Sequence, residues 1–168
     1  MLEGIKVIDC ASFIAGPAST TIMSDFGADV IKIESPGRGD PYRNSVSAGP
    51  TDGDLPAQWT LDNRNKKGLA LDLKTPEGLD VLYRLVEQAD VFVTNMPFPV
   101  RKRLKISYED LAPLNERLIY GSLSAYGEAG PDADRAGFDS TALWARTGLM
   151  DLVKPSPDSA PARSLPGM

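Results

Sequence analysis

The stretch from residue 4 to residue 34 constrains the fold of this chain more than any other part. It opens with a short apolar run at residues 5–9, rich in β-branched side chains, which indicates a buried strand. An Ala-Gly-Pro tripeptide follows at residues 15–17 and indicates that the extended chain has ended before it. Pro17 suits the first position of a helix, because its fixed φ and missing N–H are tolerated there. Residues 18–26 then have apolar side chains at helical spacing.

A glycine and a second strand complete this unit. Gly27 is a natural left-handed end for the helix, and residues 29–34 form another β-branched run. Strand, helix and strand make a βαβ unit, whose connection is right-handed and whose strands are parallel. The ligand of such a unit lies beyond the carboxyl ends of the strands, near the helix N-terminus. The turn at residues 12–18 is therefore the first candidate for a functional site.

The rest of the chain continues the alternation of strands and helices. Thr75, Pro76 and Glu77 have the order of an N-cap, a first helical residue and an acid at the positive helix end. Ser107 begins a capping box. We expect further strands at residues 69–73, 90–95 and 118–124, and further helices at residues 75–89, 107–114 and 139–148. The long polar segment at residues 35–58 indicates a functional loop or lid.

This alternation, with about five strands, predicts an α/β fold. We expect an open, mostly parallel, Rossmann-like sheet with helices on both faces. Residues 1–150 are expected to form one part of an α/β domain, and the proline-rich residues 151–168 a linker or arm. Three features should meet at the carboxyl ends of the strands: the turn at residues 16–17, the turn at residues 95–97 and the loop at residues 124–137.

The composition excludes several kinds of chemistry. The 168 residues include no histidine, so Ser-His-Asp and Cys-His catalysis and most zinc sites are absent. The single cysteine, Cys10, excludes an internal disulfide, suits a reducing cytoplasm and is interpreted as a small buried hydrophobe. A net charge of −5 argues against a nucleic-acid partner. Glu3 and Lys6 interrupt any signal peptide, and no apolar run is long enough to predict a membrane span.

Local motifs do not identify the ligand. The first turn contains Gly16 but lacks the three glycines of a dinucleotide fingerprint, and no P-loop pattern occurs. Two basic clusters, at residues 64–67 and 101–105, are either solvated faces or a site for a phosphate-rich ligand; charge alone favours solvated faces. Asp139 is either an N-cap or, since carboxylates can act without histidine, a nucleophile; its local sequence favours the N-cap.

Many ordered segments together resemble the family III CoA-transferases. This superfamily includes formyl-CoA transferase, carnitine CoA-transferase and α-methylacyl-CoA racemase. The resemblance covers essentially the whole chain, at residues 2–9, 15–17, 25–34, 36–40, 65–67, 71–78, 89–91, 95, 121–122, 126–127 and 136–139.

The resemblance implies a coenzyme A site at the carboxyl ends of the strands. It favours the interpretation of both basic clusters as ligand contacts over that of solvated faces. The implied contacts, in chain order, are Ile14 and Ala15 beside the CoA turn; Leu71, Asp72, Leu73 and Lys74 at the adenine and phosphates; Asn95, Met96 and Pro97 at the pantetheine; Arg103 at a phosphate; and Ala136, Gly137, Phe138 and Asp139 at the thioester end.

The resemblance also implies that the catalytic group lies outside these residues. The family's nucleophilic aspartate follows a Gly-Asp pair just after a stretch like residues 164–168, so no catalytic residue is expected before Met168. Family members are longer and have a second domain that forms an interlocked dimer. The implied activity is CoA transfer from an acyl-CoA to a carboxylic acid through an aspartyl intermediate, with no metal.

Two alternatives remain. The racemase branch uses a histidine where this chain has Phe138, which favours the transferase. A non-catalytic CoA-binding or assembly module is the other. A Gly-Asp pair and a long continuation encoded after Met168 would support the enzyme, and residues 1–168 alone are expected to have no turnover.

Overall fold

The computed structural model describes residues 1–44 and 57–161. The chain divides into two compact units, Met1–Leu123 and Ser124–Met168, which are described separately. Residues 45–56, half of the predicted loop or lid at residues 35–58, and the end of the proline-rich arm lie outside the described residues. The predicted domain boundary near residue 150 stays a prediction.

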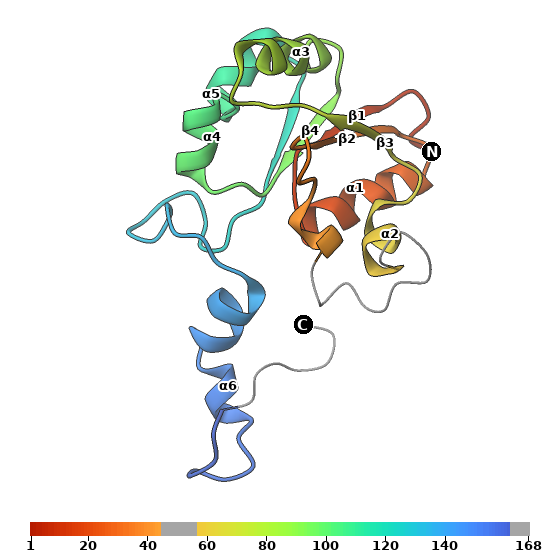
Figure 1. Ribbon diagram of the computed structural model, residues 1–168. Helices are drawn as coiled ribbons and strands as arrows, with labels where there is room; N and C mark the ends of the chain where they lie inside the picture. Colours follow the sequence, from red (N-terminus) through yellow and green to blue (C-terminus); the bar gives the residue numbers. More distant parts are fainter. Residues whose placement is uncertain (45–56, 162–168) are drawn as a thin grey trace. The chain divides into compact units, whose positions relative to one another are not determined.

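The first unit is built on a five-stranded parallel sheet with strand order β3-β2-β1-β4-β5 (Figure 1). The predicted α/β fold is confirmed, and the described sheet is wholly parallel. Its strands are β1 (Lys6–Asp9), β2 (Asp29–Glu34), β3 (Lys67–Ala70), β4 (Val91–Thr94) and β5 (Ile119–Ser122).

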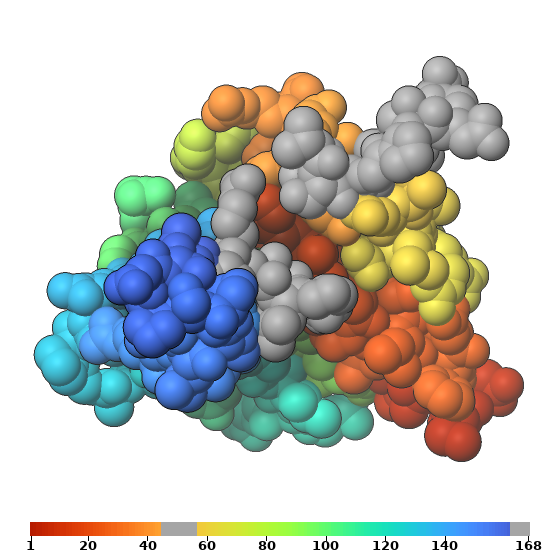
Figure 2. Space-filling model, turned by 90° about the horizontal axis from the view of Figure 1, so that it is seen from below, coloured from red at the N-terminus to blue at the C-terminus, as the bar shows by residue number. Residues whose placement is uncertain are grey.

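Helices cover both faces of this sheet. From β1 the chain moves to β2 and β3 on one side, and then to β4 and β5 on the other, so right-handed connections place the helices on opposite faces. The helices are α1 (Ala15–Asp25), α2 (Ala57–Asn63), α3 (Pro76–Val86), α4 (Phe98–Leu104) and α5 (Tyr108–Leu111). Helices α1 and α2 lie beside one another, and their residues adjoin at the surface (Figure 2).

Alternate side chains of the central strands supply two separate cores. Ile8 and Phe92 point into a core shared with α3 and α5. Val7 and Val93 point to the other face, where Met23 of α1 packs. Because successive residues of a strand face opposite sides, the apolar runs of β1 and β4 are buried on both.

Several elements differ from expectation at their ends. Helix α1 begins at Ala15, so Pro17 lies in its first turn and not at its first residue. Strand β3 begins and ends earlier than residues 69–73. Helices α2 and α4 were not predicted. The N-cap is confirmed, since the hydroxyl of Thr75 accepts a hydrogen bond from the N–H of Gly78 at 3.1 Å.

The second unit contains a π-helix (Asp139–Ala145) and α6 (Leu149–Leu152), separated by Gly148 at φ +80°. Its charged side chains interact within the unit: Asp132 pairs with Arg135 and Arg146, and the Arg146 guanidinium lies 5.0 Å from the centre of the Tyr126 ring. Its large apolar side chains are mostly exposed: Phe138, Leu143, Leu149, Leu152 and Val153.

Among the described residues, no helix is both long and apolar enough to cross a membrane.

Candidate functional site

The turns after β1 and β4 meet at the carboxyl edge of the sheet. The two strands are neighbours, but the chain leaves them toward opposite sides, and open α/β sheets bind ligands at such switch points. The N–H of Ser12 donates to Asn95 Oδ1 at 2.9 Å, and Asn95 Nδ2 donates back to the carbonyl of Ser12 at 2.7 Å. The turns after β1 and β4 therefore meet as predicted, but through Ser12, because residues 16–17 lie within α1. The third expected feature, at residues 124–137, belongs to the other unit.

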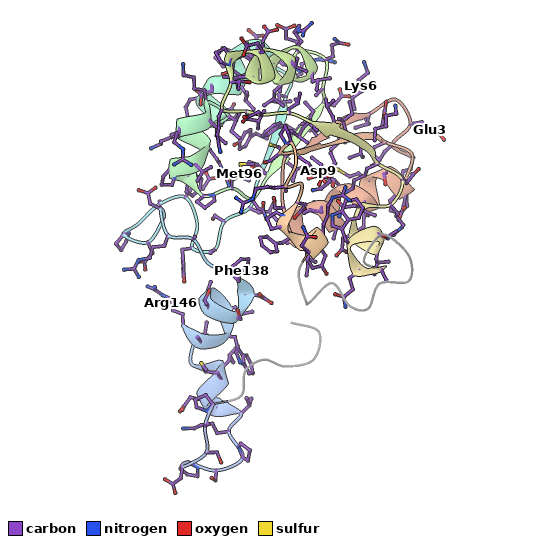
Figure 3. The ribbon with its side chains drawn as sticks, in the orientation of Figure 1. Glu3, Lys6, Asp9, Met96, Phe138 and Arg146 are labelled. Atoms are coloured by element: carbon purple, nitrogen blue, oxygen red, sulfur yellow. The ribbon has the colours of Figure 1, made fainter. Side chains whose placement is uncertain are left out.

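A cleft lies along this edge. Its inner part has a volume of about 700 Å³ and is lined by Ser12, Met96 and residues of the segment 33–44. A second hollow of about 520 Å³ shares several of these residues and reaches Gly68, Leu69 and Ala70 of β3. The cleft therefore follows the carboxyl ends of the strands from β4 to β3. Figure 3 labels Met96 together with Asp9 and Lys6, the last and first residues of β1.

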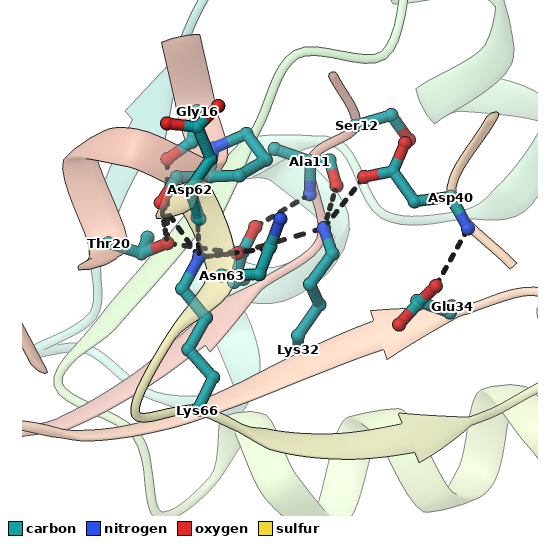
Figure 4. A network of polar contacts seen from close by, with 12 residues as sticks. Ala11, Ser12, Gly16, Thr20, Lys32, Glu34, Asp40, Asp62, Asn63 and Lys66 are labelled. Carbon is teal, nitrogen blue, oxygen red and sulfur yellow. Dashed lines mark hydrogen bonds and ion pairs between the residues drawn. The ribbon is translucent and has the colours of Figure 1, made fainter. Parts of the chain in front are cut away.

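A buried network of charged and polar side chains lies next to the cleft, at the ends of β1 and β2 (Figure 4). Asp9 is 0% exposed, and its Oδ2 accepts from Lys66 Nζ at 2.8 Å and from the Thr20 hydroxyl at 2.9 Å. Lys32 Nζ lies 3.8 Å from the same oxygen and donates to the carbonyl of Ala11 at 2.8 Å. Two lysine ammonium groups thus lie beside the Asp9 carboxylate. A second buried carboxylate makes the numbers of positive and negative charges in the network equal.

That second carboxylate is Asp40, which joins the loop after β2 to the turn after β1. Its Oδ2 lies 3.1 Å from Lys32 Nζ, and its Oδ1 accepts from the N–H groups of Phe13 and Tyr42 at 3.1 and 2.9 Å. Phe13 has φ +65°, a left-handed backbone that is unfavourable for a large side chain. Asp40 on one side and Asn95 on the other hold this turn in place, as a strained position requires.

Glu34 closes the loop that forms the wall of the cleft. Its carboxylate accepts two hydrogen bonds from Arg43, each 2.7 Å, and one from the N–H of Asp40 at 2.7 Å. Burial alone would raise the pKa of Glu34, but these hydrogen bonds outweigh it and hold the pKa below its ordinary value. The Arg43 guanidinium also lies 3.5 Å from the centre of the Trp59 ring.

Both basic clusters contain a residue that faces inward. The Lys66 side chain is 2% exposed and contacts Asp9, the carbonyls of Pro17 and Asp62, and Asn63; burial lowers its pKa, and Asp9 opposes that shift. Arg101 is buried and donates to Ser122 and to the carbonyls of Met96 and Leu123. Internal acceptors hold the charged groups of both residues, and the interpretation of the two clusters as ligand contacts stays a prediction.

The other expected contacts are distributed unevenly. Met96 lines the cleft, and Asn95 joins its two turns. Ile14 and Ala15 are exposed where α1 begins, without a side-chain cap among the described residues. Of the remaining predicted contacts, Leu71, Asp72, Leu73 and Lys74 follow β3, Pro97 precedes α4, Arg103 is exposed on α4, and Ala136, Gly137, Phe138 and Asp139 belong to the second unit.

The largest group of lining residues was not among the predicted ligand contacts, although it lies in the segment 35–58 that was predicted to be a functional loop or lid. Ser35, Gly37, Arg38 and Gly39 all line both hollows. A signal was present, because this glycine-rich segment follows directly after a strand predicted to end at the ligand edge. Both glycines adopt left-handed backbones, at φ +74° and +65°.

Cys10 lies at the end of β1 and is buried, as predicted. Burial raises the pKa of its thiol to about 12, so the thiol stays protonated near neutral pH. Among the described residues no group of three or more acidic, histidine or cysteine side chains could hold a metal ion.

Comparison with known proteins agrees with this geometry. A family model described as CoA-transferase family III matches residues 2–168. The chain is 39% identical to (R)-2-hydroxy-4-methylpentanoate CoA-transferase of Clostridioides difficile, over 91% of this chain and 39% of that protein. It is 38% identical to cinnamoyl-CoA:phenyllactate CoA-transferase of Clostridium sporogenes, over 100% of this chain and 41% of that protein.

A solved structure shows the same fold. A CAIB/BAIF family protein from Brucella suis is 36% identical, with a TM-score of 0.82 over 96% of this chain and 42% of its own. The chain thus spans about two fifths of the length of the relatives that it matches.

Proposed function

Because this chain belongs to CoA-transferase family III, we propose that the complete protein transfers coenzyme A from an acyl-CoA to a carboxylic acid. The observation that carries this proposal is the match along residues 2–168, together with the cleft at the switch point of the sheet. The two relatives described above are both named as CoA-transferases that act on organic acids. In this proposal the nucleophile is a carboxylate, as the family resemblance implies.

In this proposal coenzyme A binds along the carboxyl edge of the first unit. Ile14 and Ala15 flank the ligand at the start of α1, and Asn95, Met96 and Pro97 contact the pantetheine. The residues after β3, Leu71 to Lys74, contact the adenine and phosphates, and Arg103 binds a phosphate. Residues 136–139 close the thioester end. Binding energy from these remote contacts fixes the thioester for attack.

The chemical steps use an aspartate that follows Met168. Its carboxylate attacks the acyl carbon, the C–S bond breaks with its electron pair on sulfur, and a mixed anhydride forms beside the CoA thiolate. The thiolate then attacks the aspartyl carbonyl and releases the donor acid, which leaves CoA as an enzyme thioester. The acceptor carboxylate attacks this thioester, and the released thiolate takes the new acyl group from the resulting anhydride, regenerating the aspartate.

The exposed apolar side chains of the second unit fit a homodimer in which further chain covers them. A racemase of the same superfamily is the alternative activity. The residue at its histidine position is Phe138, which favours the transferase over proton transfer by imidazole.

The test is an acyl-CoA exchange assay with the complete protein and a panel of acyl-CoA donors and acids. We expect a new acyl-CoA only when an acceptor acid is present, and a mass adduct of CoA on the protein when it is absent. Arg103→Gln should raise the KM for acyl-CoA, whereas Arg84→Gln, an exposed arginine of α3, should leave it unchanged. Efficient exchange of the α-proton of a 2-methylacyl-CoA without any acceptor would contradict the proposal.

A further inference from the structure

The turn after β4 is held in place from both of its sides. On one side, Asn95 exchanges two hydrogen bonds with the backbone of Ser12. On the other side, the carbonyl of Met96 accepts a hydrogen bond from Nε of Arg101, a residue of α4. The N–H of Met96 donates to the hydroxyl of Thr94 at 3.2 Å. Both backbone polar groups of Met96, a residue that lines the cleft, therefore have a fixed partner.

The guanidinium of Arg101 also reaches the chain that leaves β5. Its two terminal nitrogens donate to the hydroxyl of Ser122 at 2.6 Å and to the carbonyl of Leu123 at 2.8 Å. The N–H of Leu123 donates to the carbonyl of Thr94 at 3.0 Å, where the paired parts of β4 and β5 end. Beyond that point the side chain of Arg101 joins the two chains, because it binds the backbone of both.

The guanidinium of Arg101 is buried without a carboxylate partner among the described residues. The residue is 2% exposed and, unlike the buried Asp9 and Lys32, it takes part in no ion pair within residues 1–44 and 57–161. Its charge is compensated by three oxygen acceptors and by the Phe98 ring, whose centre lies 4.5 Å from the guanidinium carbon. An apolar side chain could fill this space without the desolvation that a cation requires. The guanidinium instead supplies a planar fork of donors, which fixes its acceptors relative to one another.

We infer that Arg101 is a positioning residue for coenzyme A, and that it acts through Met96 to keep the turn at residues 95–97 in the shape that receives the pantetheine. The inference rests on the proposed function, which places this turn at the pantetheine, and it adds a residue outside the contacts proposed there. The same side chain fixes the backbone at Leu123, the last residue of the first unit. A displaced turn should weaken binding of the whole ligand but not of its nucleotide part, since only the pantetheine meets this turn.

The experiment compares the Kd values of two ligands for the complete protein by isothermal titration calorimetry. One ligand is coenzyme A, and the other is adenosine 3′,5′-bisphosphate, which has the same nucleoside but lacks the pantetheine. The variants are Arg101→Met and Arg101→Lys. The matched control is Val91→Ala, which also removes buried contacts but lies at the amino end of β4, opposite the turn.

We expect Arg101→Met to weaken coenzyme A binding about tenfold, because the Met96 carbonyl loses its donor, and to leave the Kd of the bisphosphate unchanged. Arg101→Lys keeps the charge but replaces the fork by a single ammonium group, so it should weaken coenzyme A binding less. Val91→Ala should change neither Kd value.

A loss of affinity confined to coenzyme A supports the inference. If Arg101→Met weakens both ligands equally, or weakens neither, while the unmodified protein still transfers CoA, the inference is wrong and the proposed function stands. If the unmodified protein neither binds nor transfers CoA, both are wrong. Should Arg101→Met fail to fold, Arg101→Lys and Ser122→Ala, which removes one acceptor of the guanidinium, decide by the same comparison of the two ligands.

Discussion

The two units of this chain are stabilised in different ways. In the first unit, Ile8, Leu82 and Phe92 are almost fully buried, and ionic groups such as Asp9 and Lys32 are buried and paired. In the second unit most large apolar side chains are exposed, and Asp132 forms ion pairs with Arg135 and Arg146. The first unit therefore has its own core, whereas the second leaves apolar surface that further chain or a second copy would cover.

The same contrast bears on function. The cleft at the carboxyl edge is formed by residues of the first unit, held by a buried network. The residues expected at the thioester end, 136–139, lie in the unit with little core. Under the proposed function, the contacts of the first unit can therefore be tested apart from those of residues 136–139.

The largest effect is expected where a buried charge loses its partner. Asp9→Ala leaves Lys66 without its carboxylate in the interior, and such changes destabilise by about 3–5 kcal/mol. Urea unfolding of the 168-residue chain should show this loss. The matched control, Asp25→Ala, removes the exposed pair with Arg64 and should cost less than about 1 kcal/mol.

A second replacement sharpens this result. Asp9→Ala combined with Lys66→Met removes both charges and should recover part of the lost stability. Equal unfolding midpoints for Asp9→Ala and Asp25→Ala would show that the buried network does not stabilise the first unit. They would contradict the difference in stabilisation inferred for the two units.

The next prediction compares the loss of a leucine side chain in the first unit with the loss of a leucine side chain in the second. Leu82 of α3 is 0% exposed, and Leu82→Ala should cost about 2–5 kcal/mol because it leaves a cavity. Leu152 of α6 is 79% exposed, and Leu152→Ala should change the stability of the 168-residue chain by less than about 0.5 kcal/mol. Thermal unfolding measures both. A large loss from Leu152→Ala would mean that the second unit has a core of its own.

A smaller effect is expected from acid. The pKa of Glu34 lies below its ordinary value of 4.5 in the folded chain, so its contribution is present above that value and is lost as pH falls through the lower, folded pKa. Glu34→Gln should cost about 1 kcal/mol at pH 7, since both partners are partly exposed, and the difference from the parent chain should shrink on acidification. Urea titrations at several pH values test this, with the exposed Glu116→Gln as control. A difference that stays constant with pH would contradict it.

The sequence allowed the sheet to be predicted where local signals were strong. Strand β2 is observed at the predicted residues, and Gly27 has the expected left-handed backbone at φ +103°. Strand β3 was placed too late because it is an edge strand whose side chains are mostly exposed, so its apolar pattern is weak. Helices α2 and α4 have only seven residues each, too few for a clear helical period.

The site was harder to predict because its contacts are distant in sequence. Asn95 joins the turn at Ser12 across 83 positions, and the two turns could be expected to meet only because both follow strands. Lys66 was interpreted as a ligand contact, but its partner Asp9 lies 57 positions away. No local pattern distinguishes a lysine that is buried beside a distant carboxylate from one that is exposed on a turn.

The measurement that tests the central claim most directly is hydrogen exchange of the complete protein with and without coenzyme A. We propose that the cleft of the first unit is the CoA site, so the ligand should slow exchange in the turn at residues 12–15, the loop at residues 35–40 and the turn at residues 95–97. Slower exchange confined to residues 124–161, with these three segments unchanged, would contradict that proposal.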